Sequence, residues 1–286
     1  MAFKMPPGLC RPRTASVLAA VLLTACAAPQ PPLDPAVIGE VWPGYGILKG
    51  YLPPAQLPDS LALLPRPPAE GSPGFEDDRA SFFALTALQS TPRGPLALRD
   101  ADLTSPNAAQ AFSCALGLPI DARQTPHLAM LLRRTLGDAS LAPYAAKNAW
   151  RRARPFTVLR TPSCVPAEEA GLASDGSYPS GHASAGWAWA LVLAEIAPDR
   201  ADALLQRGRA FSQSRAICGV HWKSDIEAGR LVGAATVARL HAEPVFLAQL
   251  AAARQEVVVA RQNPPAPVAD CTAEAAALES TRELAP

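Results

Sequence analysis

Apolar residues recur at helical spacing over most of the chain between about residues 75 and 261. From Phe75 to Leu88, an acidic start at residues 76–78 precedes apolar positions three or four apart, the charge distribution that a helix N-terminus prefers. The same spacing predicts further helices at roughly 107–116, 126–136, 141–153, 181–197, 200–215, 224–241 and 244–261. The segment 181–197 is apolar on every side, which is typical of a buried helix, with Trp187 and Trp189 in the core. The pattern therefore predicts an all-α fold, a compact helical bundle.

Two proline-rich segments flank the predicted helical domain, which occupies residues 71–262. Residues 27–70 contain many of the 31 prolines, in pairs such as Pro31-Pro32 and Pro53-Pro54. We expect this segment to be extended and to wrap the body without helices of its own. Residues 263–286 form a Pro/Ala-rich tail that we expect to be loosely ordered unless Cys271 pins it.

The N-terminus has the pattern of an export signal. Three basic residues, Lys4, Arg11 and Arg13, precede an apolar run from Ala15 to Ala25, so residues 1–26 are predicted to be a signal peptide. Its end, Leu-Thr-Ala-Cys at residues 23–26, resembles a lipobox, although ordinary cleavage fits almost as well. We therefore expect a periplasmic protein. If the lipobox is used, a lipid on Cys26 anchors the protein to the outer membrane. No later stretch reaches the roughly 18 uninterrupted apolar residues of a spanning helix.

Composition limits the other partners and sites. The formal net charge is +1, so no overall field favours nucleic acid. After Cys10 and Cys26, four cysteines remain, at positions 114, 164, 218 and 271. In an oxidising compartment they allow three disulfide pairings, and four buried thiols are the alternative. No CxxC spacing is present, and no metal site is predicted.

The first cluster that carries chemistry is Lys147, followed after six residues by Arg154-Pro155. Seven positions are almost two helical turns, which predicts both cations on one helix face, with Arg154 at the helix end because Pro155 follows it. The alternative is a solvated basic face that includes Arg151 and Arg152.

The second cluster is Pro179-Ser180-Gly181-His182, directly before the apolar helix. Ser180 occupies the N-cap position, and Gly181 lets an anion approach the backbone amides of the first turn. His182 is then placed to donate a proton to a bound group, although a structural histidine is the alternative.

The third cluster is Ser214-Arg215, followed after five residues by His221 and after three more by Asp225. A carboxylate four positions after a histidine can accept one ring N–H and leave the other nitrogen free as a nucleophile. The Arg215 guanidinium offers a bidentate fork to phosphate oxygens. For the two remaining histidines, His127 and His241, we expect surface or helix-end roles.

Together these three clusters resemble the signature of the phosphatidic acid phosphatase type 2 superfamily, which also contains vanadium haloperoxidases. The surrounding sequence, including Tyr51-Leu52-Pro53 and the residues Gly-Trp-Ala-Trp-Ala at 186–190, is similar to the class A bacterial non-specific acid phosphatases over roughly residues 40–260. One departure is Ala183, which stands where that class commonly has threonine.

The resemblance implies an exported acid phosphatase that hydrolyses small phosphate monoesters without a metal ion or other cofactor. Phosphotransfer to alcohols is a side reaction open to any phosphohistidine enzyme, and nothing in the sequence encodes it separately. His221, oriented by Asp225, would attack phosphorus, and His182 would protonate the leaving group. Because His221 must be neutral while His182 is charged, mildly acidic pH is favoured. The phosphoryl group would be held by the set Lys147, Arg154, Ser180, Gly181 and Arg215.

Two other functions share parts of this pattern. A vanadium-dependent haloperoxidase would hold vanadate in the same cradle, with His221 as its axial ligand. A non-catalytic phosphate-binding protein would need the cations but not the pair of His221 and Asp225. For the predicted enzyme itself, a homo-oligomer is the general expectation for a helical enzyme of this size.

Overall fold

The computed structural model describes residues 31–263 and 270–281 of the chain. Its fold is all-α, as predicted, and the one pairing of extended backbone in the described residues is an isolated bridge between Glu40 and Leu48. The α-helices of these residues are α1 (Pro35–Ile38), α2 (Ser60–Leu63), α3 (Pro73–Thr86), α4 (Arg93–Arg99), α5 (Ser113–Leu116), α6 (Pro126–Leu141), α7 (Tyr144–Trp150), α8 (Pro155–Leu159), α9 (Glu169–Ser174), α10 (Gly181–Ile196), α11 (Ala201–Ile217), α12 (Lys223–Leu240), α13 (Pro244–Gln262) and α14 (Cys271–Glu279).

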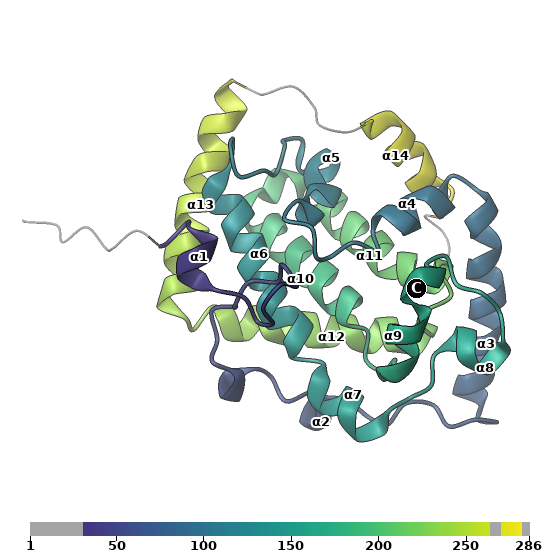
Figure 1. Cartoon of the computed structure of the whole chain (residues 1–286). Helices are drawn as coiled ribbons and strands as arrows, with labels where there is room; N and C mark the ends of the chain where they lie inside the picture. Colours follow the sequence, from purple (N-terminus) through teal and green to yellow (C-terminus); the bar gives the residue numbers. More distant parts are fainter. Residues whose placement is uncertain (1–30, 264–269, 282–286) are drawn as a thin grey trace, which may run out of the picture.

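Helix α10 lies at the centre of the bundle and packs against α6, α11 and α12 (Figure 1). Small residues allow this close packing. A Cβ atom at Gly186 of α10 would lie 2.3 Å from the Phe211 ring of α11, so a larger residue there would push the two helices apart. Trp189 is buried in the same core, where its indole N–H donates to the Leu132 carbonyl of α6 at 2.8 Å. Trp187 was also predicted to lie in the core, but it is only partly buried and packs against the core from outside.

The four predicted helices from residue 181 to 261 correspond to α10–α13 within two residues at each end. The predicted helix 141–153 exists but has the wrong bounds, because α6 continues to Leu141 and α7 spans only Tyr144–Trp150. Arg151 has a left-handed backbone (φ 42°) that no α-helix can continue through. The predicted helix 107–116 is a 3₁₀ helix at Ala108–Phe112 followed by α5. The periodicity gave no indication of the short helices α4, α8 and α9.

The segment 27–70 is extended over much of its described length, but the prediction that it has no helices is wrong. Two one-turn helices, α1 and α2, form where an aspartate accepts a backbone N–H at the N-cap, Asp34 and Asp59 respectively. The segment is attached to α6 through Asp138, whose carboxylate accepts the backbone amides of Tyr51 and Leu52 at 2.8 and 3.0 Å. These bonds fix residues 51 and 52 against α6.

Two disulfides connect distant parts of the chain, Cys114 to Cys271 and Cys164 to Cys218. The alternative of four buried thiols is therefore wrong. Residues 271–279 of the predicted loose tail form α14, and Glu274 of this helix is buried beside Arg207 of α11 at 3.3 Å. The predicted signal peptide with Cys26 lies outside the described residues.

In residues 31–263 and 270–281, no single helix is long and apolar enough to cross a bilayer. Helices α12 and α13 meet the criterion only when taken together, and they are bent by 96° relative to each other.

Candidate active site

Residues from all three sequence clusters line one cavity of about 470 Å³. Lys147 of α7 and Arg154 before α8 contribute the first cluster, Gly181 and His182 of α10 the second, and His221 the third. A cavity of this size can hold a small organic phosphate. The chain therefore collects its predicted chemistry in one place, although not every predicted residue reaches the cavity surface.

The second and third clusters meet because the N-termini of α10 and α12 are joined. The Ser180 amide donates to the Asp225 carbonyl at 2.9 Å. A Cβ atom at Gly229 of α12 would lie 2.4 Å from the Ser180 carbonyl oxygen, so only glycine permits this approach. Ser180 itself is fully buried, and its hydroxyl oxygen accepts the Ala183 amide at 3.2 Å as the N-cap of α10. The Ser180 hydroxyl is thus a helix cap, whereas Gly181 lines the cavity.

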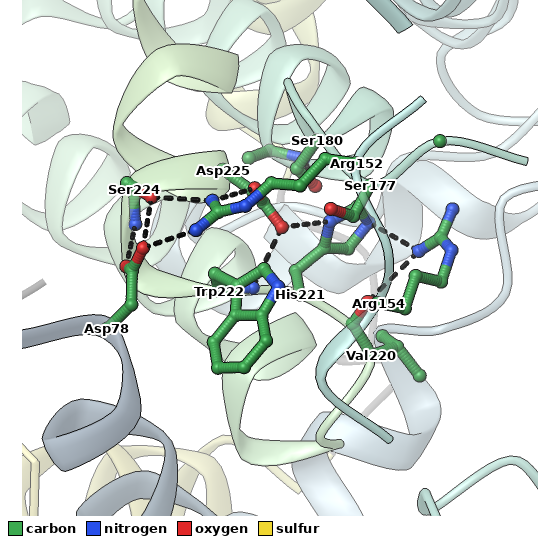
Figure 2. A network of polar contacts seen from close by, with 12 residues as sticks. Asp78, Arg152, Arg154, Ser177, Ser180, Val220, His221, Trp222, Ser224 and Asp225 are labelled. Atoms are coloured by element: carbon green, nitrogen blue, oxygen red, sulfur yellow. Dashed lines mark hydrogen bonds and ion pairs between the residues drawn. The ribbon is translucent and has the colours of Figure 1, made fainter. Parts of the chain in front are cut away.

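His221 is held by contacts at both ring nitrogens (Figure 2). Its Nδ1 lies 3.3 Å from the Asp225 carboxylate, and its Nε2 lies 3.0 Å from the Arg154 guanidinium. Because a guanidinium can only donate, Nε2 is the acceptor and Nδ1 carries the proton. Burial, and then the positive charges of Arg154 and Lys147, hold the pKa of His221 well below its usual value. The imidazole is therefore neutral, and its Nε2 lone pair accepts a hydrogen bond from Arg154.

Asp225 is fixed by a buried network that the sequence analysis missed (Figure 2). Its carboxylate accepts the Trp222 amide at 2.8 Å and pairs with Arg152 at 2.6 Å. The same guanidinium pairs with Asp78 of α3 at 2.6 Å and donates to the Ser224 hydroxyl at 2.7 Å. Arg152 is thus a buried link between α3 and α12 and does not belong to a solvated basic face. Its position between Lys147 and Arg154 in the sequence was the one available signal for its role, since its partner Asp78 lies 74 positions away.

Lys147 and Arg154 do not share a helix face, because the chain turns at Arg151, but their charged ends converge. Both are buried, and both pair with the Asp175 carboxylate, at 2.9 Å from Lys147 Nζ and 3.2 Å from the Arg154 guanidinium. Burial, and then the charge of Arg154, lowers the pKa of Lys147 to about 8, while Asp175 opposes this shift. Asp175, which the sequence analysis also missed, is the anion that these two cations now share.

Arg215 lies behind the cavity lining, close enough to His182 and Arg154 to shift their electrostatics, but it does not itself line the cavity. Its side chain is fully buried, and all three guanidinium nitrogens lack a hydrogen-bond partner in the described part of the chain. Burial, and then the charge of Arg154, lowers its pKa to about 10, so it remains charged at neutral pH. A buried charged group without partners is costly. An anion with several oxygens would satisfy it.

His182 lines the cavity, and its Nε2–H donates to the Ala101 carbonyl at 2.8 Å. Burial, and then the charge of Arg215, holds its pKa well below the usual histidine value. The free protein therefore carries a neutral His182 at neutral pH. The expectation of a charged His182 is met only at acidic pH or when an anion offsets the neighbouring cations.

The other two histidines lie away from the cavity. His241 ends α12 and contacts Glu195 at 2.8 Å, and His127 contacts Gln249 at 2.7 Å. Within residues 31–263 and 270–281, there is no group of three or more histidine, cysteine, aspartate or glutamate side chains arranged to hold a metal ion.

Comparison with known proteins identifies the family of the chain. The family model of the PAP2 superfamily matches residues 128–245. The chain is 45% identical to the non-specific acid phosphatase of Providencia stuartii over 207 residues, which cover 72% of this chain and 84% of that protein. It is 40% identical to the acid phosphatase of Zymomonas mobilis, over 73% of this chain and 79% of that protein. The same identity links it to the non-specific acid phosphatase of Salmonella typhimurium, over 71% of this chain and 82% of that protein. With three motifs at one cavity and this extent of similarity, the chain belongs to the PAP2 superfamily, among its class A bacterial non-specific acid phosphatases.

Proposed function

We propose that the protein is an acid phosphatase that hydrolyses phosphate monoesters through a phosphohistidine on His221. The observation that carries this proposal is the pairing of a neutral, oriented imidazole with a cluster of buried cations. His221 Nε2 lies beside Arg154, and Arg215 offers a complete guanidinium fork. Such an arrangement neutralises the phosphoryl oxygens, which would otherwise repel a nucleophile.

In the first half-reaction, His221 Nε2 attacks phosphorus in line with the ester oxygen. The N–P bond forms as the P–O bond to the leaving group breaks, and a protonated His182 gives its proton to the departing oxygen. Asp225 accepts the Nδ1 hydrogen of His221 and stabilises the positive charge that develops on the ring. The bound dianion also raises the pKa of His182, because it offsets the charge of Arg215.

In the second half-reaction, His182 is neutral and takes a proton from water. The hydroxide attacks phosphorus, the N–P bond breaks, and inorganic phosphate leaves with His221 restored. An alcohol that enters in place of water would accept the phosphoryl group, which accounts for the expected phosphotransferase activity. Neither half-reaction needs a metal ion, since the fixed cations supply the positive charge.

Substrate binding requires an exchange of anions at the cradle. Lys147 and Arg154 must release Asp175 before their donors can bind phosphoryl oxygens. Asp175 is one-third exposed, whereas both cations are nearly inaccessible to solvent. The carboxylate can therefore move toward water while the cations stay in place.

Hydrolysis of p-nitrophenyl phosphate at about pH 5 to 7, around the histidine titration range, tests the proposal. We expect activity that survives EDTA and is lost in His221→Ala. His241→Ala is the matched control, because it removes a histidine outside the cavity and should retain activity. Equal activity in the His221→Ala and wild-type proteins would contradict the proposal.

We also propose that the protein is exported to the periplasm by residues 1–26 and anchored to the outer membrane through a lipid on Cys26. Two disulfides support an oxidising compartment. Labelled palmitate should be incorporated in the expressing bacterium and be absent from Cys26→Ala. A soluble, unlabelled periplasmic protein would support ordinary cleavage instead.

A further inference from the structure

The cavity extends beyond the phosphate cradle to an aromatic wall made by two distant segments. Trp42 of the N-terminal segment and Tyr144 at the start of α7 both line it. Their rings meet edge to face, with centroids 6.2 Å apart and an interplanar angle of 61°. Trp42 is 38% exposed, whereas Trp189 and Trp222 are buried in the core. An accessible tryptophan at a cavity is available for contact with a ligand.

The local sequence holds Trp42 in this position. Between Glu40 and Leu48, which pair in an isolated antiparallel bridge, the backbone turns back on itself. Inside this turn the Val41 amide donates to the Ile47 carbonyl at 2.8 Å. Leu48, at the base of this turn, is fully buried. The Tyr45 ring also meets Trp42 edge to face, with ring centroids 6.2 Å apart. The indole is therefore ordered before a ligand arrives, which reduces the entropy cost of binding.

The aromatic wall begins next to the cations. Tyr144 lies one helical turn before Lys147, and the Lys147 ammonium is 6.0 Å from the centre of the Tyr144 ring. A phosphate ester bound at Lys147 would thus place its organic group against Tyr144 and Trp42. Asp102 and Glu168 also line the cavity, so an organic group with further negative charge would be repelled.

We propose that Trp42 and Tyr144 form a subsite for planar, uncharged leaving groups, so that aryl and nucleoside monophosphates are preferred over aliphatic phosphates. This inference rests on the proposed phosphatase function and names the substrate class of the same site. The ring faces supply contact area and quadrupole complementarity to a flat ligand. The carboxylates at the rim can accept hydrogen bonds from neutral hydroxyl or amino groups.

The test compares kcat/KM for phenyl phosphate, adenosine 5′-monophosphate and glycerol 2-phosphate in wild type, Trp42→Ala and Trp42→Phe. The ratio of kcat/KM for either aromatic substrate over glycerol 2-phosphate should fall about tenfold in Trp42→Ala, equal to about 1.4 kcal/mol. Trp42→Phe should keep most of the ratio, because a flat ring remains. Dividing by the glycerol 2-phosphate value cancels general damage to the cradle.

Phe83→Ala is the matched control, since Phe83 is an exposed aromatic residue on α3 that does not line the cavity. Its substrate ratios should equal those of wild type. An unchanged ratio in Trp42→Ala, or an equal loss for all three substrates, would overturn the subsite. Failure of the phosphatase function itself would look different, because wild type and His221→Ala would then hydrolyse none of the substrates or hydrolyse them equally.

Discussion

Replacing Asp175 by asparagine removes the negative charge that Lys147 and Arg154 now share, while keeping the size of the side chain. An incoming phosphate must break both contacts, at 2.9 and 3.2 Å. Hydrogen bonds to charged groups contribute about 1.5 to 3 kcal/mol each. The one-third exposure of Asp175 and the amide oxygen that remains both reduce this gain. We therefore expect inorganic phosphate to bind Asp175→Asn about tenfold more tightly, equal to about 1.4 kcal/mol.

The assay is competitive inhibition of p-nitrophenyl phosphate hydrolysis by phosphate, at about pH 5.5 and about pH 8. Asp175 raises the pKa of Lys147 toward its usual value, so its removal lowers that pKa further below about 8. Lys147 is charged below its pKa, and the gain in affinity should therefore be complete at the lower pH and diminish at the higher one.

Asp77→Asn is the control for this prediction, because Asp77 is a surface carboxylate that pairs with Lys223 outside the cavity. Its inhibition constant should match that of wild type. Weaker phosphate binding in Asp175→Asn at about pH 5.5 would refute the reasoning, since Asp175 would then be organising the cations rather than competing for them.

Three further predictions concern the cations and the two histidines. Arg215→Lys should lower kcat/KM at least about a hundredfold, because an ammonium cannot reproduce the fork; a loss below about fivefold would contradict the role. Arg152→Ala leaves the buried carboxylates of Asp225 and Asp78 without their partner and should lower the free energy of unfolding, measured in urea, by about 3 to 5 kcal/mol. A decrease under about 1 kcal/mol would contradict the role of this network. The pKa of neutral His221 and that of protonated His182 are both lowered. Activity should thus rise as pH passes the pKa of His221 and fall as it passes the pKa of His182, which places the optimum of kcat/KM below about pH 6.5. An optimum above about pH 7 would contradict this assignment.

Local patterns in the sequence predicted the long helices and singled out the three clusters from which Lys147, Arg154, Gly181, His182 and His221 line the cavity. Helices α10 to α13 have continuous apolar spacing and clear ends, and their positions follow from that alone. The pairing of His221 with Asp225 depends on a four-residue separation within one segment, which a sequence displays directly. The structure confirms the all-α fold, and the similarity to known acid phosphatases confirms the family.

The residues that the sequence did not reveal depend on contacts between distant segments. Arg152 resembles its exposed neighbour Arg151, and only the approach of α3 shows that it is buried against Asp78. The left-handed turn at Arg151 has no glycine to indicate it. Trp42 lies in a proline-rich segment without periodicity, so its place at the cavity follows from the fold alone. Long-range pairs of this kind leave no trace in local spacing.

The proposed covalent intermediate can be trapped most directly by rapid quenching of the protein with a ³²P-labelled phosphate monoester. We predict an acid-labile, alkali-stable label that maps to the peptide containing His221, absent from His221→Ala. His182→Ala should retain the label when the leaving group is a good one such as p-nitrophenol. Label of the same stability on the His221→Ala protein, or turnover of wild type without any label on His221, would contradict the account.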